Sequence, residues 1–144
     1  MIYTLISIIV PTYKEAKNIP LLVEKIDQNM KSARLPYEII VVDDNSRDGI
    51  VECIEKLNNT FNLKIVVRKN EKGLSSAVLE GFHRAAGEIL VVMDADLSHP
   101  PEKISNLVLQ IIEKKNRRPS PPVHVSQIAR RATLLFCRDH ALGA

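Results

Sequence analysis

Two aspartates follow an apolar run in the stretch LVVMDADLSHPPEKI, residues 90–104. Asp94 and Asp96 stand one residue apart, where a strand suited to a protein interior would end. Two carboxylates about 6 Å apart repel each other by roughly 3 kcal/mol at an effective dielectric near 20. A hard divalent cation, Mg²⁺ or Mn²⁺, reverses the sign of that interaction because it prefers carboxylate and phosphate oxygens as ligands. The spacing therefore indicates a divalent metal and a phosphate-bearing ligand.

Polar side chains also follow the other apolar runs. Tyr13 and Glu15 come after the first run, and Asp43 and Asp44 come near the end of the second. The third run is followed by a basic group, Arg68, Lys69 and Lys72. Open α/β sheets bind ligands beyond the carboxyl ends of their strands. Because a second pair of acids accompanies the Asp-x-Asp, we expect these acids to need a cation.

Other side chains in these loops are compatible with more than one role. Asp94 and Ser98 alone could cap a turn and the next helix, but the second acidic pair favours a ligand site. His99 fits a ligand contact and an exposed loop histidine equally, and we expect His83 at the surface. Lys72 could reach an anionic ligand or stay solvated, since the single glycine after it is too little for a phosphate-binding loop.

Apolar runs and helical periodicity alternate four times along the chain. Strands are expected over 4–12, 37–46, 63–69 and 88–94. Helices are expected over 18–30, over the segment whose buried face would be Ile50, Val51, Ile54 and Leu57, and over 73–87 and 101–115. The strands are apolar throughout, which is typical of strands covered on both faces. This pattern predicts an α/β fold with a mostly parallel sheet flanked by helices.

Residue types at the helix ends suggest how the helices begin and stop. Asn18 is a candidate cap, with Pro20 in the first turn. Ser46 or Asp48 is expected to cap the second helix, and Gly87 to close the third.

Length and charge narrow the function classes. The 144 residues suffice for one domain with a substantial core. The net charge is +3, but residues 1–115 contain 15 basic and 16 acidic side chains, and residues 116–144 contain five basic and one acidic. The basic character belongs to the tail, so we expect no nucleic-acid binding.

Membrane segments and disulfides are not expected. No apolar run approaches the roughly 18–20 residues that span a bilayer, and the apolar start lacks a basic segment before it. Cys53 and Cys137 lie far apart without metal-like spacing, which is typical of a reduced cytoplasmic protein.

The composition changes after residue 116. The segment 117–144 has three prolines in four residues and no strand like those before it. Within it, ARRATLLFCR, residues 129–138, could form a short helix. We therefore expect two parts: residues 1–116 as the α/β part and 117–144 as an atypical, poorly packed basic tail. The abrupt change in composition suggests a frameshift, an alternative end or a truncation.

Four motifs together resemble a known family. SIIVPTYKEAKNI, YEIIVVDDNSRDG, EKGLSSAVLEGF and VVMDADLSHPPE resemble, in order and spacing, the amino-terminal part of the dolichyl-phosphate mannosyltransferases, inverting family 2 glycosyltransferases. The resemblance covers residues 4–116 and implies a GT-A-type, Rossmann-like fold that is C-terminally incomplete. After Lys115 that family continues with a strand and an arginine that contacts the donor phosphate. Here RRPSPPV follows instead, so that Arg117 or Arg118 would have to replace that arginine.

The resemblance also implies roles for single residues. It assigns nucleotide-sugar contacts to three segments: Pro11, Tyr13 and Glu15; Val42 and Asp44; and Asp94, Ala95 and Asp96. The first two segments would hold the base and ribose. In the third, Asp94 and Asp96 would be the catalytic residues, ligating Mg²⁺ or Mn²⁺ at the diphosphate. Some relatives have a metal-ligating glutamine where Ser98 stands, so Ser98 is left outside the expected metal shell.

The implied activity is transfer of mannose from GDP-mannose to dolichyl or another polyprenyl phosphate. The transfer would be metal-assisted, would invert the anomeric centre and would occur at the cytoplasmic face of a membrane. Two alternatives stay open: an inactive nucleotide-sugar-binding remnant, and a UDP-glucose-using dolichyl-phosphate glucosyltransferase. A phosphoacceptor receiver domain is disfavoured, because its acidic pair would end the first strand and a later strand would end in lysine.

Overall fold

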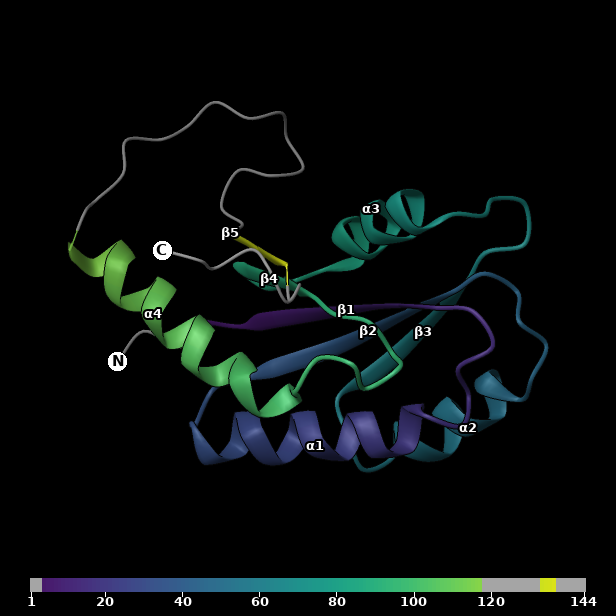
Figure 1. The fold of residues 1–144 in the computed structure, drawn as a ribbon, viewed down its shortest axis with the longest axis horizontal. Coiled ribbons are helices and arrows are strands. Elements are labelled where there is room, and N and C mark those ends of the chain that lie inside the picture. Colours follow the sequence, from purple (N-terminus) through teal and green to yellow (C-terminus); the bar gives the residue numbers. More distant parts are fainter. Residues whose placement is uncertain (1–3, 118–132, 137–144) are drawn as a thin grey trace.

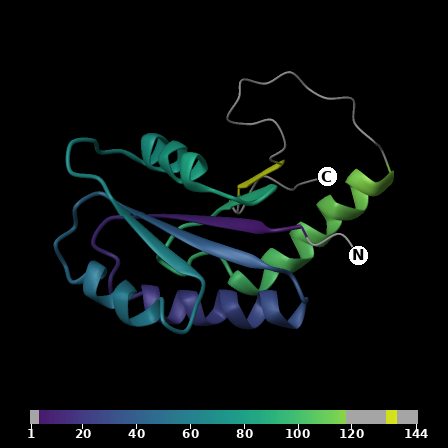
Figure 2. The same cartoon turned by 180° about the vertical axis from the view of Figure 1, so that it is seen from behind.

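The computed structural model describes residues 4–117 and 133–136. One five-stranded sheet carries helices on both faces (Figures 1 and 2). The strands are β1 (Ile6–Thr12), β2 (Tyr37–Asp43), β3 (Leu63–Val67), β4 (Ile89–Val92) and β5 (Thr133–Phe136). The helices are α1 (Ile19–Ser32), α2 (Ile50–Leu57), α3 (Leu74–Arg84), the short 3₁₀ helix η1 (Pro101–Lys103) and α4 (Ile104–Arg117). The expected α/β class with helices flanking the sheet is confirmed.

The strand order reverses at β1. The sheet runs β3-β2-β1-β4-β5, and every neighbouring pair is parallel. Ile8 of β1 lies opposite Ile39 of β2 on one side and Val91 of β4 on the other. The chain therefore builds outward from β1 in one direction and then, from β4 onward, in the other.

Two apolar layers cover the sheet. Figure 1 shows α1, α2 and α4 on one face and α3 on the other. Ile8 and Val10 point into the layer shared with α1, whereas Ile9, between them, is buried against Ala77 of α3 and its neighbours. Both faces of the strands are thus covered, as their continuous apolar sequence predicted. Within the residues described, no helix is long and apolar enough to cross a membrane.

The predicted helix caps are wrong in detail. Asn18 precedes α1, but its side-chain amide donates to the Glu15 carboxylate at 2.6 Å instead of capping the helix. Gly49, with φ +88°, precedes α2, while Asp48 accepts a hydrogen bond from the backbone N–H of Ala16. The Asn18 bond stays within the turn before α1, whereas the Asp48 bond joins the loop after β2 to the loop after β1, a tertiary use that local cap rules do not anticipate.

Two further predictions about the helices differ from the structure. Val51, expected on the buried face of α2, is 37% exposed. The helix α3 ends at Arg84, so Gly87 does not cap it. A Cβ on Gly87 would lie 2.5 Å from Ser7 Oγ, which shows that close backbone packing requires the glycine there.

The tail contributes one strand to the sheet. Residues Thr133–Phe136 form β5, which pairs parallel to β4. The expectations of no strand and of a short helix over 129–138 are therefore wrong for these four residues. The run TLLF is too short for a clear strand signal, and the open edge of β4 supplies the hydrogen bonds that decide its conformation. The remainder of 118–144, with Cys137, lies outside the described residues.

The buried carboxylate of Glu38 links neighbouring strands at the amino edge of the sheet, the edge where the parallel strands begin. Glu38 is 6% exposed and accepts hydrogen bonds from Ser7 Oγ at 2.6 Å and from the backbone N–H of Ala86 at 2.7 Å. Lys64 Nζ lies 3.1 Å from the same carboxylate. Burial raises the pKa of Glu38, but these hydrogen bonds and the lysine outweigh it, so the pKa is lowered overall.

We predict that Glu38→Gln destabilises the fold in a pH-dependent way. Because the folded-state pKa lies below the ordinary value of 4.5, ionised Glu38 stabilises the fold above that pH. This contribution is lost as the pH falls through the folded-state pKa. Urea denaturation at pH 7 should show a loss of about 1.5–3 kcal/mol in unfolding free energy. The difference in unfolding free energy between the variant and wild type should become smaller below pH 4.5. A difference that does not depend on pH would contradict the stabilising role of ionised Glu38. Exposed Glu55→Gln is the control.

We also predict that Gly81→Ala destabilises the chain although alanine favours helices. A Cβ at Gly81 of α3 would lie 2.5 Å from Ile9 Cγ2 and 2.8 Å from Ile9 Cγ1. Overpacking of about 1–3 kcal/mol should exceed the gain of about 1 kcal/mol in helix propensity. Thermal unfolding should show a lowered midpoint. In an Ile9→Ala background the destabilisation by Gly81→Ala should disappear. As a control, His83→Ala on the exposed face of α3 should not change the unfolding midpoint.

Candidate functional site

The carboxyl ends of β1, β2 and β4 meet at one edge of the sheet. The backbone N–H of Asp44 donates to the Thr12 carbonyl at 3.1 Å, and that of Met93 donates to the Ile9 carbonyl at 3.1 Å. The segment after β1 therefore lies between the loop that begins at Asp44 and the loop that follows β4. Strand order reverses here, and open α/β sheets bind ligands at such reversal points.

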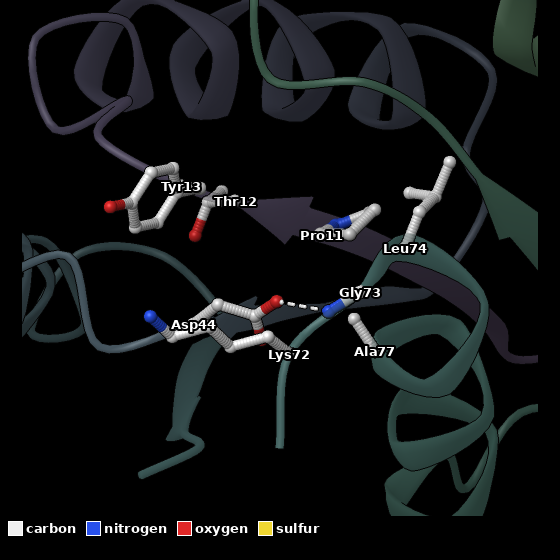
Figure 3. Close-up of a pocket in the computed structure, with 8 residues that line it drawn as sticks. All are labelled: Pro11, Thr12, Tyr13, Asp44, Lys72, Gly73, Leu74 and Ala77. Atoms are coloured by element: carbon white, nitrogen blue, oxygen red, sulfur yellow. Dashed lines mark hydrogen bonds between the residues drawn. The ribbon is translucent and has the colours of Figure 1, made fainter. Parts of the chain in front are cut away.

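A pocket of about 430 Å³ opens at this edge (Figure 3). Its lining comes from β1, the β2 end and the start of α3: Pro11, Thr12, Tyr13, Asp44, Lys72, Gly73, Leu74 and Ala77. The volume is within the range of small-molecule sites. Tyr13 is 53% exposed, with Lys14 Nζ 5.2 Å from its ring centroid. The exposed ring offers a flat face on which a base can stack. Three predicted nucleotide contacts, Pro11, Tyr13 and Asp44, are thus brought together.

Arg68 holds Asp44 in the wall of the pocket. Its Nε and Nη2 donate to Asp44 Oδ1 at 2.7 and 2.6 Å. The backbone N–H of Gly73 donates to Asp44 Oδ2 at 3.0 Å, the bond that is dashed in Figure 3. The same guanidinium donates to Ser76 Oγ at 2.7 Å and to the Gly73 carbonyl at 2.9 Å. The two charged side chains are only 6% and 13% exposed. This buried ion pair fixes the loop between β3 and α3.

Both acids at the end of β2 have hydrogen-bond partners within the protein, and the expected cation is supplied to Asp44 by an arginine instead of a metal. Asp43 is 1% exposed and accepts hydrogen bonds from Thr12 Oγ1 at 2.9 Å and from Ser46 Oγ and N–H at 2.5 and 2.8 Å. Asp44 has Arg68 as its cation. Of the predicted acids, those after β4 therefore remain as candidate metal ligands.

Three predicted contacts lie outside the lining of the pocket. Val42 is 0% exposed in the layer under α3, and Ala95 is 3% exposed in the opposite layer. Their side chains are core, so a ligand contact from either residue would use the backbone. Glu15 accepts the hydrogen bond from Asn18 and holds the turn before α1. Ligand contacts from these residues stay predictions.

The loop after β4 presents its two aspartates differently. The Asp94 side chain is 51% exposed. Asp96 is exposed, and its Oδ1 accepts hydrogen bonds from the Ser98 N–H at 3.0 Å and from Ser98 Oγ at 2.5 Å. These bonds lower the pKa of Asp96. Leu97, with φ +63°, makes the tight turn between Asp96 and Ser98. Ser98 therefore positions Asp96.

The donor set fits a cation that is shared with a diphosphate. Within the described residues, no group of three or more His, Cys, Asp or Glu side chains could hold a metal ion. Asp94 and Asp96 supply two carboxylates, the ligand type that hard divalent cations prefer. Mg²⁺ is often held by one or two carboxylates, with substrate phosphates and water completing its shell. The arrangement suits that kind of site better than a closed structural one.

Three side chains that the sequence left undecided now have positions. Lys72 lines the pocket. His99 is only 9% exposed, and its Nδ1 lies 3.7 Å from Asp94 Oδ2, so an exposed loop histidine is wrong. Arg117 pairs with Glu113 at the end of α4, about 20 Å along that helix from its start. That position does not favour Arg117 as the donor-phosphate arginine, and Arg118 lies outside the described residues.

The chain is similar in sequence to known glycosyltransferases. Residues 7–122 match the family described as Glycosyl transferase family 2. The dolichol-phosphate mannosyltransferases of Pyrococcus furiosus and Saccharomyces cerevisiae are 48% and 50% identical to it over 103 residues. The aligned stretches cover 72% and 70% of this chain, but 29% and 39% of those proteins. The chain thus spans about a third of the length of the curated relatives it matches.

A solved structure agrees with the fold. The mannosyltransferase PcManGT from Pyrobaculum calidifontis, in complex with GDP-Man and Mn²⁺, superimposes with a TM-score of 0.57 and 31% sequence identity. The match covers 72% of this chain and 31% of that one. The expected GT-A-type fold is confirmed. With the family match over residues 7–122, this shows that the chain belongs to glycosyl transferase family 2 and is similar, within it, to the dolichol-phosphate mannosyltransferases.

Proposed function

We propose that this chain is the donor-binding part of a dolichyl-phosphate mannosyltransferase. The observation that carries the proposal is the placing of the pocket and of the Asp94–Asp96 loop at the same carboxyl edge, where strand order reverses. Identities of 48% and 50% to dolichol-phosphate mannosyltransferases support the choice of substrates. The donor would be GDP-mannose and the acceptor dolichyl or another polyprenyl phosphate, at the cytoplasmic face of a membrane.

The base of the donor would occupy the pocket. Tyr13 would stack on the guanine ring, because its side chain is exposed at the pocket. Asp44 would accept hydrogen bonds from the ring N–H groups, held ready for this by Arg68. Pro11 and Glu15 would help to hold the base and ribose, and Val42 would contact the base through its backbone.

The diphosphate would lie over the loop after β4. Asp94 and Asp96, with the backbone of Ala95, would hold Mg²⁺ or Mn²⁺ against it. When bound, the cation would neutralise the charge that develops on the departing GDP, which is Lewis-acid assistance. The acceptor phosphate is already ionised at neutral pH, so this chain's side chains need not supply a general base. In-line attack on the anomeric carbon would invert it and give a β-linked mannosyl phosphate lipid.

The proposal predicts metal-dependent binding of GDP-mannose. Calorimetric titration of the full chain should show binding with Mn²⁺ that weakens more than about tenfold without it or in Asp96→Asn, a change of about 1.4 kcal/mol or more. The carboxamide keeps the shape of Asp96 but removes the charge that the metal requires. Glu55→Gln, an exposed acid on α2, is the matched control and should bind like wild type.

The same titration separates the alternative functions. Tighter binding of UDP-glucose than of GDP-mannose would indicate that the chain uses a glucosyl donor instead of a mannosyl donor. Binding of GDP-mannose without transfer to added dolichyl phosphate would indicate a nucleotide-sugar-binding remnant. Failure to bind either nucleotide sugar would reject the donor site.

We further predict that Arg68→Lys weakens both the fold and the nucleotide site. A single ammonium group cannot reproduce the hydrogen bonds to Asp44, Ser76 and Gly73. The free energy of unfolding should fall by about 1–3 kcal/mol, and GDP-mannose should bind more weakly because Asp44 loses its fixed orientation. Arg84→Lys on α3, whose side chain is 57% exposed in its pair with Glu80, should change neither. A fully stable Arg68→Lys variant with wild-type affinity would refute the role given to this ion pair.

A further inference from the structure

His99 carries an unexplained buried nitrogen. The residue is 9% exposed. Within the described residues, its Nδ1 is the one buried side-chain nitrogen or oxygen without a hydrogen-bond partner. Buried polar groups nearly always have a partner, and one that lacks it often has a functional explanation. The nitrogen belongs to the same loop as the two aspartates.

The backbone around His99 is constrained on both sides. Leu97 adopts φ +63°, and Pro100 restricts the residue before it to extended conformations. Pro101 is buried at the start of η1, which anchors the end of the loop. The imidazole is therefore held in place by the chain and by burial.

Asp94 is the charged group nearest to this nitrogen. Its Oδ2 lies 3.7 Å from His99 Nδ1, beyond the 2.7–3.2 Å of a formed N–H···O hydrogen bond. The Asp94 side chain is 51% exposed, so solvent and not packing surrounds half of it. No hydrogen bond within residues 4–117 otherwise holds the Asp94 carboxylate, whereas Asp96 is already oriented by Ser98. Of the two acids, Asp94 is the one that lacks a fixed orientation.

We propose that His99 is a positioning residue for Asp94: its Nδ1–H donates to Asp94 Oδ2 and turns the other carboxylate oxygen toward the cation. The inference rests on the proposed function, since it requires that Asp94 be a metal ligand. Carboxylates that bind metals are commonly oriented by such outer hydrogen bonds, and their loss typically costs 10–100-fold in metal affinity. The neutral imidazole with its proton on Nδ1 suffices, so no change of protonation is involved.

Three variants of His99 test this proposal, because they differ in where the side chain places a hydrogen-bonding N–H group. Asparagine places an N–H close to where Nδ1 stands, glutamine places one nearer Nε2, and leucine has none. We expect His99→Asn to bind Mn²⁺ within about threefold of wild type in the presence of GDP. His99→Gln and His99→Leu should bind it about tenfold more weakly. The measurement is the free Mn²⁺ signal in electron paramagnetic resonance during titration of the full chain.

Thermal unfolding without metal gives a second readout. Since His99→Leu removes a buried nitrogen that has no partner, its midpoint should equal or exceed that of wild type while its Mn²⁺ affinity falls. A merely structural histidine would lower stability and leave Mn²⁺ affinity unchanged in all three variants, and that result would overturn the inference. If the leucine variant does not fold, the asparagine and glutamine variants still decide. His83→Leu, exposed on α3, controls for loss of an imidazole elsewhere.

Asp96→Asn separates this inference from the function on which it rests. If that variant loses Mn²⁺ and the His99 variants do not, the role of His99 is wrong and the metal site stands. If the wild-type chain with GDP does not bind Mn²⁺, both are overturned.

Discussion

The pairing of β1 with both β2 and β4 is the constraint on which the site depends. The register between β1 and β2 is fixed at both ends by polar pairs, since Ser7 bonds to Glu38 opposite it at the amino edge, and Thr12 bonds to Asp43 opposite it at the carboxyl edge. A slip of one residue would exchange the faces of every side chain on the moving strand. Asp43 would then lose the hydroxyl of Thr12, and Asp44 would leave the wall of the pocket. The polar network at the amino edge thus helps to position the candidate site at the other edge.

The four acids at the carboxyl edge have four different surroundings. Hydroxyl and amide groups surround buried Asp43, and the guanidinium of Arg68 pairs with Asp44. After β4, Asp96 has Ser98, and Asp94 has only the distant nitrogen of His99. Asp44, which lines the pocket, is paired with a cationic side chain, whereas no lysine or arginine among the described residues pairs with Asp94 or Asp96 on the loop after β4. The proposed base site therefore lies at the end where Asp44 is paired with Arg68, and the proposed cation site lies at the end of Asp94 and Asp96.

The sequence predicted the alternation of elements and the acidic strand ends well, because apolar runs and periodicity are local signals. It did not predict that Arg68 would pair with Asp44, since that pair joins the ends of β2 and β3 across 24 residues. A basic residue following a strand beside an acidic strand end was the available signal. The burial of His99 depends on how the loop packs, which no local pattern records. The strand β5 forms because β4 offers an open edge, so four residues acquired a structure that their own sequence did not indicate.

The distribution of charge has a consequence for how the proposed donor and cation would bind. A diphosphate approaching Asp94 and Asp96 alone would meet repulsion, and a cation at two carboxylates alone would keep most of its water. Each ligand therefore supplies what the other lacks, and their affinities must rise together by the same factor, because coupling between two binding equilibria is reciprocal. The proposed base site would contribute little to this coupling, since the charge of Asp44 is already balanced by Arg68. In the proposed function, recognition of the base and recognition of the diphosphate would thus be separable properties of one sheet edge.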